Sequence, residues 1–442
     1  MPASGTPKRD ATRVALVLDA GGARSAYQVG ALEVLIPALA ERGTRPRLLL
    51  GTSAGALLST VLGATAHLEP EEQVARLKTM LGQTTKQNVM RPLWRQVPEV
   101  LARYASETLG LSSFRLSGLL GSQPLAQTLT QSIDWEALHR NVEEGLVEAA
   151  AVTATSVRTG RVMVFTESAS PVPRSAPEYH GRFVATRLDV SHLMASSAIP
   201  ALFPSVHVDE PAEAAGWYVD GATRRRSPLA AALELGADRV VVVGTGGLRP
   251  PNEDPDLDGV AVDLGDGAAT LLGAVMDDPL RHDLRRLAEL NELTGDAELA
   301  PILKRHREAR GRSAYRTVPY VAVAPEYGEE LARAAMQVFR ANHGSLRRTL
   351  GDPDLQVMHR LLGSDSPLQG ELLSYLLFDP DFFAAASACG HRDALSWVEQ
   401  NPDLWRTDRL PGHGNERIDR VMIHHHRARQ PLHAQREALR FT

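Results

Sequence analysis

Two apolar segments near the beginning of the chain each end in a tight glycine turn and continue as a helix-forming stretch. The first is RVALVLDAGGARSAYQVGALEVL, residues 13–35, and the second is PRLLLGTSAGALLSTVL, residues 46–62. Uninterrupted apolar strands that lead directly into helices are typical of βα units, whose strands are buried on both faces. Two such units in succession predict a parallel sheet.

Later parts of the chain continue this alternation. Apolar or alternating runs typical of strands lie at 147–157, 160–168, 237–246 and 319–325. Strands that alternate with helices predict an α/β protein with three layers, α/β/α, and a mostly parallel central sheet. A helical extension follows at the C-terminal end, with helices expected around 269–293, 328–342, 355–363 and 370–399.

Composition shifts along the chain suggest its organisation. We expect a flexible tail at 1–12, followed by a catalytic domain at 13–248 that contains a helical insertion at about 68–145. A loop rich in Pro, Asp and Gly follows at 249–268. The remaining region, 269–442, is expected to be mainly helical, to pack on the same sheet and to end in a basic tail from about 415. Within the insertion, 92–109 has one apolar helical face. It is either a lid or membrane-facing cap, or an ordinary helix that covers the sheet.

The overall charge and the cysteine content exclude several classes of protein. Lys and Arg number 48 against 53 Asp and Glu, a net charge of -5, so nothing predicts nucleic-acid binding. The single cysteine cannot form an internal disulfide, and the cysteine clusters of structural zinc sites are absent. We expect no metal and no cofactor. Without a secretion signal or a long apolar span, the chain is expected to be cytoplasmic and to contact membranes only peripherally.

The sequence GTSAG places a serine where a nucleophile elbow requires one. Gly51 and Gly55 flank Ser53 between an apolar strand and a helix, in the pattern GxSxG. Small residues let the strand and helix approach closely while the hydroxyl points outward, and the helix N-terminus presents free N–H groups. Ser53 is therefore the candidate nucleophile. The alternative is that the residues of this turn are small only because the strand and the helix pack closely there.

A serine nucleophile also needs donors for the oxyanion of the intermediate. The loop Gly21, Gly22, Ala23 and Arg24 follows the first strand and offers backbone N–H groups at the same sheet edge. This loop does not fit the dinucleotide pattern GxGxxG, and neither glycine turn contains the Gly-Lys-Ser/Thr of a phosphate-binding loop. We expect it to form an oxyanion hole.

The serine also needs a base. No downstream histidine follows a strand in a glycine-framed turn, whereas Asp220 ends the apolar run GWYVD and is followed by Gly221 and Ala222. A carboxylate on such a turn can approach a serine directly, so Asp220 is the candidate base. Asp266, in a second Asp-Gly-Ala sequence, is a weaker rival because no comparable apolar block precedes it.

Four blocks, DAGGARSAYQVGAL, GTSAG, ASSAIPALFPSV and YVDGATRRRSPL, occur in this order and resemble the signature blocks of the patatin-like phospholipases. The resemblance covers residues 13 to about 395. It implies a serine lipid acyl hydrolase, with Ser53 as nucleophile, Asp220 as base, the Gly21–Arg24 loop as oxyanion hole and a lipid as partner. In the third block, Ile199, Leu202 and Phe203 would line the cleft or pack in the core.

The chain departs from the family pattern at three places. Asp19 and Ala20 stand where the family usually has glycines, Ser25 replaces the glycine after the arginine, and DGA replaces DGG. Arg224, Arg225 and Arg226 stand beside the candidate base, either as a phosphate-binding group or as a solvated turn. Two alternative functions therefore stay open: a weak or inactive lipid-binding protein, and an esterase with a Ser-His-Asp triad.

Overall fold

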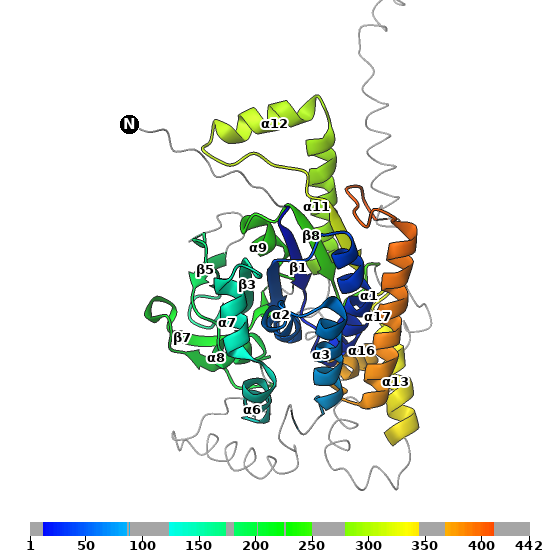
Figure 1. Ribbon diagram of the computed structural model, residues 1–442. Helices are drawn as coiled ribbons and strands as arrows, with labels where there is room; N and C mark the ends of the chain where they lie inside the picture. Colours follow the sequence, from blue (N-terminus) through cyan, green and yellow to red (C-terminus); the bar gives the residue numbers. More distant parts are fainter. Residues whose placement is uncertain are drawn as a thin grey trace, which may run out of the picture.

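The computed structural model describes residues 12–85, 88, 123–173, 181–200, 202–224, 227–249, 279–343 and 367–410. Nine strands of this part form one sheet (Figure 1). They are β1 (Val14–Leu18), β2 (Leu48–Thr52), β3 (Ala149–Ser156), β4 (Val162–Glu167), β5 (Gly181–Ala185), β6 (Val206–Val208), β7 (Gly216–Asp220), β8 (Arg239–Val243) and β9 (Tyr320–Val323).

The strand order is β5-β4-β3-β2-β1-β8-β9, and β7 joins β3 and β6 beside this path. Neighbours from β3 through β2, β1 and β8 to β9 are parallel, whereas β3 is antiparallel to β4 and β7. Every residue of β1 and β2 is buried, as continuous apolar strands covered on both faces should be. The carboxyl ends of β1, β2, β3 and β8 therefore meet at one edge.

Helices and short 3-10 turns connect these strands. The α-helices are α1 (Ser25–Glu41), α2 (Ala54–Ala64), α3 (Pro70–Gln83), α6 (Gln123–Ser132), α7 (Trp135–Glu143), α8 (Val190–Ser196), α9 (Leu229–Glu234), α11 (Pro279–Gly295), α12 (Leu299–Glu308), α13 (Glu329–His343), α16 (Pro367–Leu376) and α17 (Pro380–Gln400). The 3-10 turns are η1 (Gly22–Arg24), η2 (Ala212–Ala214) and η3 (Gly221–Thr223).

The C-terminal helices pack on the same body as the first βα units, as Figure 1 shows for α17 beside α1. These two helices approach closely because each has a glycine at the contact. A Cβ at Gly30 would meet the Ser387 carbonyl, and one at Gly390 would meet the Tyr27 carbonyl. The Tyr27 hydroxyl donates to Asp393 of α17 at 2.8 Å. Burial raises the pKa of this hydroxyl well above its usual value, so Tyr27 stays a donor.

The predicted fold class is confirmed: a mostly parallel sheet with helices on both sides and a helical C-terminal region. Two strands, β5 and β6, were not predicted, and α12 was not predicted either. The helix expected at 370–399 is two helices, α16 and α17, because Asp379 caps a new helix that begins at Pro380. The amphipathic stretch 92–109, the helix expected at 355–363 and the loop 249–268 lie outside the described residues, apart from Arg249. The domain boundaries stay a prediction.

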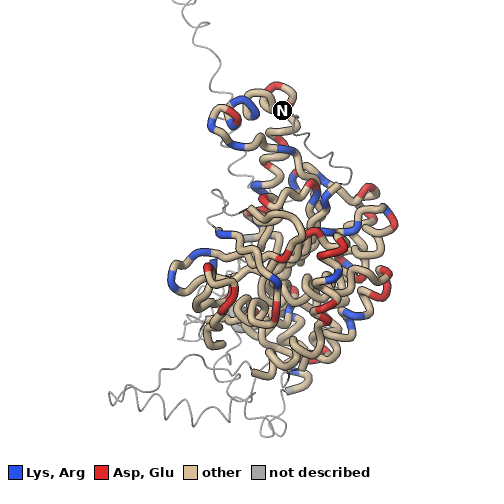
Figure 2. Tube along the Cα trace, turned by 60° about the vertical axis from the view of Figure 1, so that its left-hand side comes forward, with Lys and Arg blue, Asp and Glu red and all other residues tan. Residues whose placement is uncertain are grey.

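Charged residues of both signs are interspersed over the surface in Figure 2. Among the described residues, no single helix has the length and apolar character needed to cross a membrane. Gly370–Leu376 and Pro380–Gln400 have the required length and apolar character only when counted together, across a bend of 104°.

Candidate active site

The turn at Ser53 has the geometry expected of a strained elbow. Ser53 has φ 55° and ψ −125°, and it stands as N-cap residue between β2 and α2. A positive φ is rare for a residue other than glycine and is favoured only where the surroundings enforce it. Gly51 and Gly55 allow this turn: a Cβ on Gly51 would meet the backbone of Gly55, and one on Gly55 would meet the Asp19 carbonyl.

Helix α8 helps to hold this turn. The Ser53 amide donates to the Ser196 hydroxyl at 2.8 Å, and Ser196 is fully buried near the end of α8. The helix begins in a capping box in which Asp189 accepts from the amides of Ser191 and His192. Burial raises the pKa of Asp189, but hydrogen bonds from His192 and Ser191 lower it more, so the pKa lies well below its usual range. Asp189 is therefore an ionised cap at neutral pH.

Asp220 reaches the same place from the opposite direction. On one side of β3, Thr52 pairs with Thr153, and Asp220 pairs with the next residue, Ala154. Since β2 is parallel and β7 antiparallel to β3, the carboxyl ends of β2 and β7 meet head to head. Neighbouring positions along a strand are only about 3.3 Å apart. The sheet thus brings the candidate nucleophile and base together, although 167 residues separate them in the sequence.

Several contacts fix Asp220 at this point. Its amide donates to the Ala198 carbonyl at 2.8 Å, and its Oδ1 accepts from the Ala222 amide at 2.7 Å. The side chains of Thr52 and Thr153 bond at 2.5 Å, and Gly221 packs directly on Thr153. Asp220 is 2% exposed and Ser53 is 5% exposed. In the described residues, no direct hydrogen bond joins the Ser53 hydroxyl to the Asp220 carboxylate. Such bonds often form only once substrate is bound.

The glycine loop forms the short turn η1 beside Ser53. Gly22 has φ 51°, and a Cβ there would lie 2.5 Å from the Tyr375 carbonyl oxygen. The Arg24 amide already donates to the Gly21 carbonyl at 3.0 Å. The amides of Gly22 and Ala23 open the turn and, among the described residues, donate to no acceptor. These two amides, rather than that of Arg24, are the available donors.

The Arg24 side chain turns away from the glycine loop and binds α16. It is 1% exposed, its Nε donates to the Ser374 hydroxyl at 2.6 Å, and it forms a salt bridge with Glu371. Its guanidinium also stacks 4.2 Å from the centre of the Tyr375 ring. Arg24 therefore fixes the C-terminal helix against the loop.

Asp19, the unusual acid at the start of the loop, also turns away from the candidate oxyanion site. Its Oδ1 accepts from the Gln28 side chain at 3.1 Å, and its Oδ2 accepts from the Thr245 amide at 3.3 Å. The Thr245 bond joins the ends of β1 and β8, and the Gln28 bond joins the end of β1 to α1. Asp19, which departs from the family pattern, therefore has a structural role at this position.

An apolar pocket of about 90 Å³ lies in front of Ser53, with Gly22 and Ala54 in its wall. None of the described residues that line it is charged, and none of them is a histidine. The apolar side chains come from α2, α3, α6, the segment after α8, and α16, α17 and the residues between these two helices: Leu57, Leu58, Met80, Leu81, Leu125, Leu129, Ile199, Phe203, Leu376, Phe378 and Phe383. Ile199 and Phe203 line this pocket, so the cleft interpretation of their block fits their position. Asp220 lies behind the pocket and does not line it.

The remaining candidates are placed as follows. Arg224 is exposed at the end of η3, and Arg225, Arg226 and Asp266 lie outside the described residues. Of the histidines downstream of Asp220 in the described part, His282 lies on α11, His306 on α12 and His343 at the end of α13, and His391 lies 3.5 Å from Glu33 on the α1–α17 surface. None of these four lines the pocket in front of Ser53. His, Cys, Asp and Glu side chains of this part form no cluster of three that could bind a metal.

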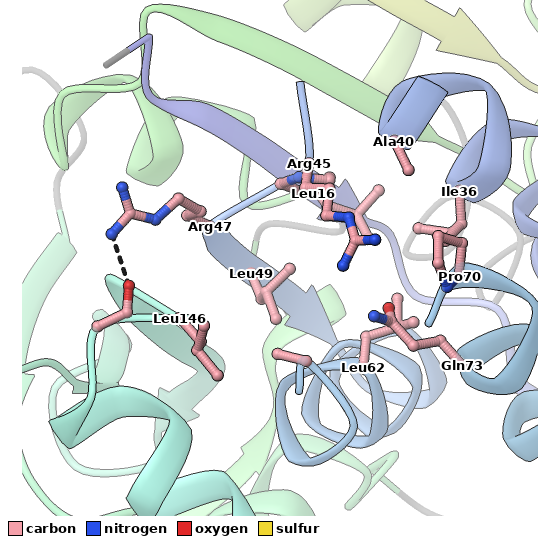
Figure 3. Close-up of a pocket in the computed structure, with 13 residues that line it drawn as sticks. Leu16, Ile36, Ala40, Arg45, Arg47, Leu49, Leu62, Pro70, Gln73 and Leu146 are labelled. Atoms are coloured by element: carbon pink, nitrogen blue, oxygen red, sulfur yellow. Dashed lines mark hydrogen bonds between the residues drawn. The ribbon is translucent and has the colours of Figure 1, made fainter. Parts of the chain in front are cut away.

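A second cavity, of about 270 Å³, lies at the opposite edge of the sheet (Figure 3). Leu16, Leu49 and Leu62 line it near the amino ends of β1 and β2. The Arg47 guanidinium points to its rim, where it donates to the Gly145 carbonyl at 2.5 Å. This cavity contains none of the candidate catalytic residues.

Sequence reasoning did not assign roles to Ser196, Thr153, Glu371 and Tyr375. Ser196 lies within the block ASSAIPALFPSV, and Tyr375 lies within the range to about residue 395 that the resemblance covers, so the resemblance pointed to the right segments. The contacts themselves are long-range, as between Arg24 and Ser374. No local pattern in the sequence indicates such a pairing.

The fold and this turn define the class of protein: an α/β protein whose parallel sheet ends in a strained serine turn beside an apolar pocket. Residues 16–233 match the family described as patatin-like phospholipase. This part of the chain is therefore a patatin-like phospholipase domain. The matched region ends before α16 and α17, which complete the pocket.

More distant similarities were found among solved structures. VipD from Legionella pneumophila is 13% identical, with 88% of this chain and 67% of that chain covered and a TM-score of 0.33. The ExoU–SpcU complex from the type III secretion system of Pseudomonas aeruginosa is 14% identical, with 91% and 73% covered and a TM-score of 0.25. Similarities this distant do not extend to substrate or partner. No curated protein matches the chain.

Proposed function

We propose that the protein is a serine lipid acyl hydrolase that cleaves carboxylic esters of phospholipids or other glycerolipids through Ser53 and Asp220. The observation that carries this proposal is the head-to-head meeting of β2 and β7 on β3, which places the strained serine beside a buried carboxylate. The uncharged pocket in front of Ser53 suits an acyl chain better than a charged head group.

In the proposed reaction, the Ser53 oxygen attacks the ester carbonyl carbon while the Asp220 carboxylate accepts the hydroxyl proton. The amides of Gly22 and Ala23 stabilise the oxyanion of the tetrahedral intermediate. The intermediate collapses to an acyl-serine, and the leaving alkoxide receives the proton from Asp220. Water, deprotonated by Asp220, then attacks the acyl group, releases the fatty acid and restores Ser53.

The structure also bears on the two alternative functions. Because the described part of the pocket has no histidine, a carboxylate that acts as general base fits better than a Ser-His-Asp triad. The missing direct bond between the Ser53 hydroxyl and Asp220 is the feature that would suit a lipid-binding protein without turnover. A fluorophosphonate probe separates these possibilities, since it labels a serine only where the nucleophile is activated.

We expect the wild-type protein to be labelled by the probe and to release fatty acid from at least one member of a panel of phospholipid, lysolipid and neutral glycerolipid esters, measured by mass spectrometry. Labelling without release from any ester would point to a substrate outside the panel's lipid classes. Neither labelling nor release, by a folded protein that still binds lipid, would exclude the hydrolase and support the binding function.

Gly22→Ala should lower kcat for a soluble short-chain ester by about 10², the usual cost of an impaired oxyanion donor. The added Cβ would face the Tyr375 carbonyl oxygen at 2.5 Å, and alanine disfavours φ 51°, so the loop must shift. Gly295→Ala is the matched control, because a Cβ there meets open space. Equal kcat values for the two variants would contradict the assignment of this loop.

A further inference from the structure

An exposed apolar pair lies next to exposed arginines at the edge of the sheet where Ser53 lies. Trp217 of β7 is 56% exposed and Val157, in the turn after β3, is 54% exposed. The Val157 amide donates to the Trp217 carbonyl at 2.9 Å, so the two residues are neighbours. Large apolar side chains left in water beside one another often mark an interaction surface.

Three arginines surround this pair. Arg158 and Arg161 are exposed in the same turn, and the Arg224 guanidinium lies against Gly160, with its Nη2 3.0 Å from the position of a Cβ there. None of the three forms an ion pair with a carboxylate in the described part of the chain. We call Val157, Arg158, Arg161, Trp217 and Arg224 the β3–β7 patch.

The arginines outnumber the acidic residues near this patch that have no cationic partner. On the loop between β6 and β7, Glu213 lies 3.9 Å from Arg182, and Asp209 lies 2.8 Å from His207. With His207 counted as neutral, Asp209 and Glu210 stand against three arginines, so the net charge of these side chains is positive. An anionic partner is therefore favoured.

The patch lies on the same side of the molecule as the candidate active site. Thr153 pairs with Thr52 at the end of β2, and β3 continues for three more residues before the turn that holds Val157. On β7, Trp217 precedes Asp220 by three residues and points to the other face, since Tyr218 and Asp220 are buried while Trp217 is exposed. One strand thus places both the candidate base and the exposed tryptophan.

We propose that the β3–β7 patch docks the protein on an anionic lipid bilayer with the Ser53 edge toward the membrane. This inference deepens the proposed function, since it names the surface from which the substrate is taken. Tryptophan favours the interface between headgroups and acyl chains, and arginines gain from a negative bilayer surface. Docking at this edge would shorten the path of a lipid from the bilayer to the apolar pocket.

A rival surface lies at the opposite pole. Helix α12 carries the exposed Ile302 and the basic residue Arg305, and Arg310 lies in the turn after it. The helix projects away from α3 and α6 (Figure 1). Docking through α12 would turn Ser53 away from the membrane. Variants at these positions match the patch variants in exposure and charge. They are therefore the control for the patch variants and also the test of docking through α12.

The experiment is co-sedimentation of the full chain, carrying Ser53→Ala so that no lipid is consumed, with vesicles of phosphatidylcholine alone or an equimolar mixture with phosphatidylglycerol. We expect binding to the mixed vesicles that weakens as salt is raised. Arg158→Gln with Arg161→Gln should weaken it roughly 25-fold, and Trp217→Ala about tenfold. Ile302→Ala and Arg305→Gln with Arg310→Gln should change it less than about twofold.

Absence of a preference for anionic vesicles, patch variants that bind like the parent, or equal losses from the α12 variants would each overturn the docking proposal. Thermal unfolding of each variant shows that it is folded. Hydrolysis of a soluble ester by the chain with Ser53 intact is measured separately. If the protein cleaves this ester but does not bind vesicles, only the docking proposal is refuted. If it binds vesicles through the patch but cleaves no ester, only the hydrolase proposal is refuted.

Discussion

Ser53→Ala is expected to abolish fluorophosphonate labelling and to lower ester hydrolysis by on the order of 10⁴ or more, the scale seen when a serine nucleophile is removed. The reason is chemical, because Ser53 lines the pocket and stands on the strained turn at the end of β2, where β3 brings β2 and β7 together. The measurement is single-turnover hydrolysis of the best ester from the lipid panel, together with gel detection of the probe.

The same site gives a second readout that does not depend on activity. Ser53 holds φ 55°, which disfavours alanine as much as serine but suits glycine. We therefore expect Ser53→Gly to be inactive yet more stable than Ser53→Ala by about 1 kcal/mol in denaturant unfolding. This difference would show that the turn stores strain at the functional residue.

Ser59→Ala is the matched control for both variants. Ser59 is buried in the same helix, where its hydroxyl donates to the Ala56 carbonyl at 3.0 Å, and it lies outside the pocket wall. It should retain labelling and hydrolysis. Labelling that persists in Ser53→Ala would show that the probe reacts elsewhere and would reject Ser53 as the nucleophile.

Asp220→Asn is expected to lower hydrolysis by about 10²- to 10⁴-fold, because an amide cannot accept the serine proton. The fold should survive, since the Asn oxygen can still accept the 2.7 Å bond from the Ala222 amide, and the Asp220 amide keeps its bond to Ala198. The rate of probe labelling should fall together with kcat, whereas KM should change little.

Asp209→Asn is the control for this change, because Asp209 is a largely exposed acid on the loop that leads into β7. Its activity should match the wild type. If Asp220→Asn were as active as Asp209→Asn, the base would lie elsewhere. A histidine variant as inactive as Ser53→Ala would then favour the triad.

The C-terminal region has a defined role in this arrangement. The family match ends at residue 233, yet Tyr375, Leu376 and Phe383 line the pocket in front of Ser53. Arg24 of the glycine loop clamps this region through Ser374 and Glu371. A chain cut after β8 would therefore lack one wall of its pocket and the side chains that bind Arg24.

The βα units, the elbow at Ser53 and the glycine loop could be predicted from the sequence because each is a local pattern. Continuous apolar strands indicate burial on both faces of the sheet. Glycines at positions 51 and 55 indicate that the backbone packs too closely there for a Cβ. The acid at Asp220 was also found locally, from a short apolar run that ends in Asp-Gly-Ala. That Asp220 and Ser53 act together as a dyad was implied by the resemblance to a family.

What the sequence determined by itself was therefore the fold class and the identity of the chemically capable residues, since both follow from short-range periodicity and turn chemistry. Only the tertiary structure decided how these residues meet. The register of β2 and β7 on β3 places Ser53 and Asp220 end to end, and the Arg24 side chain turns to α16 instead of the candidate site. Such pairings join segments more than a hundred residues apart, and they depend on packing across the whole sheet, which no local stretch encodes.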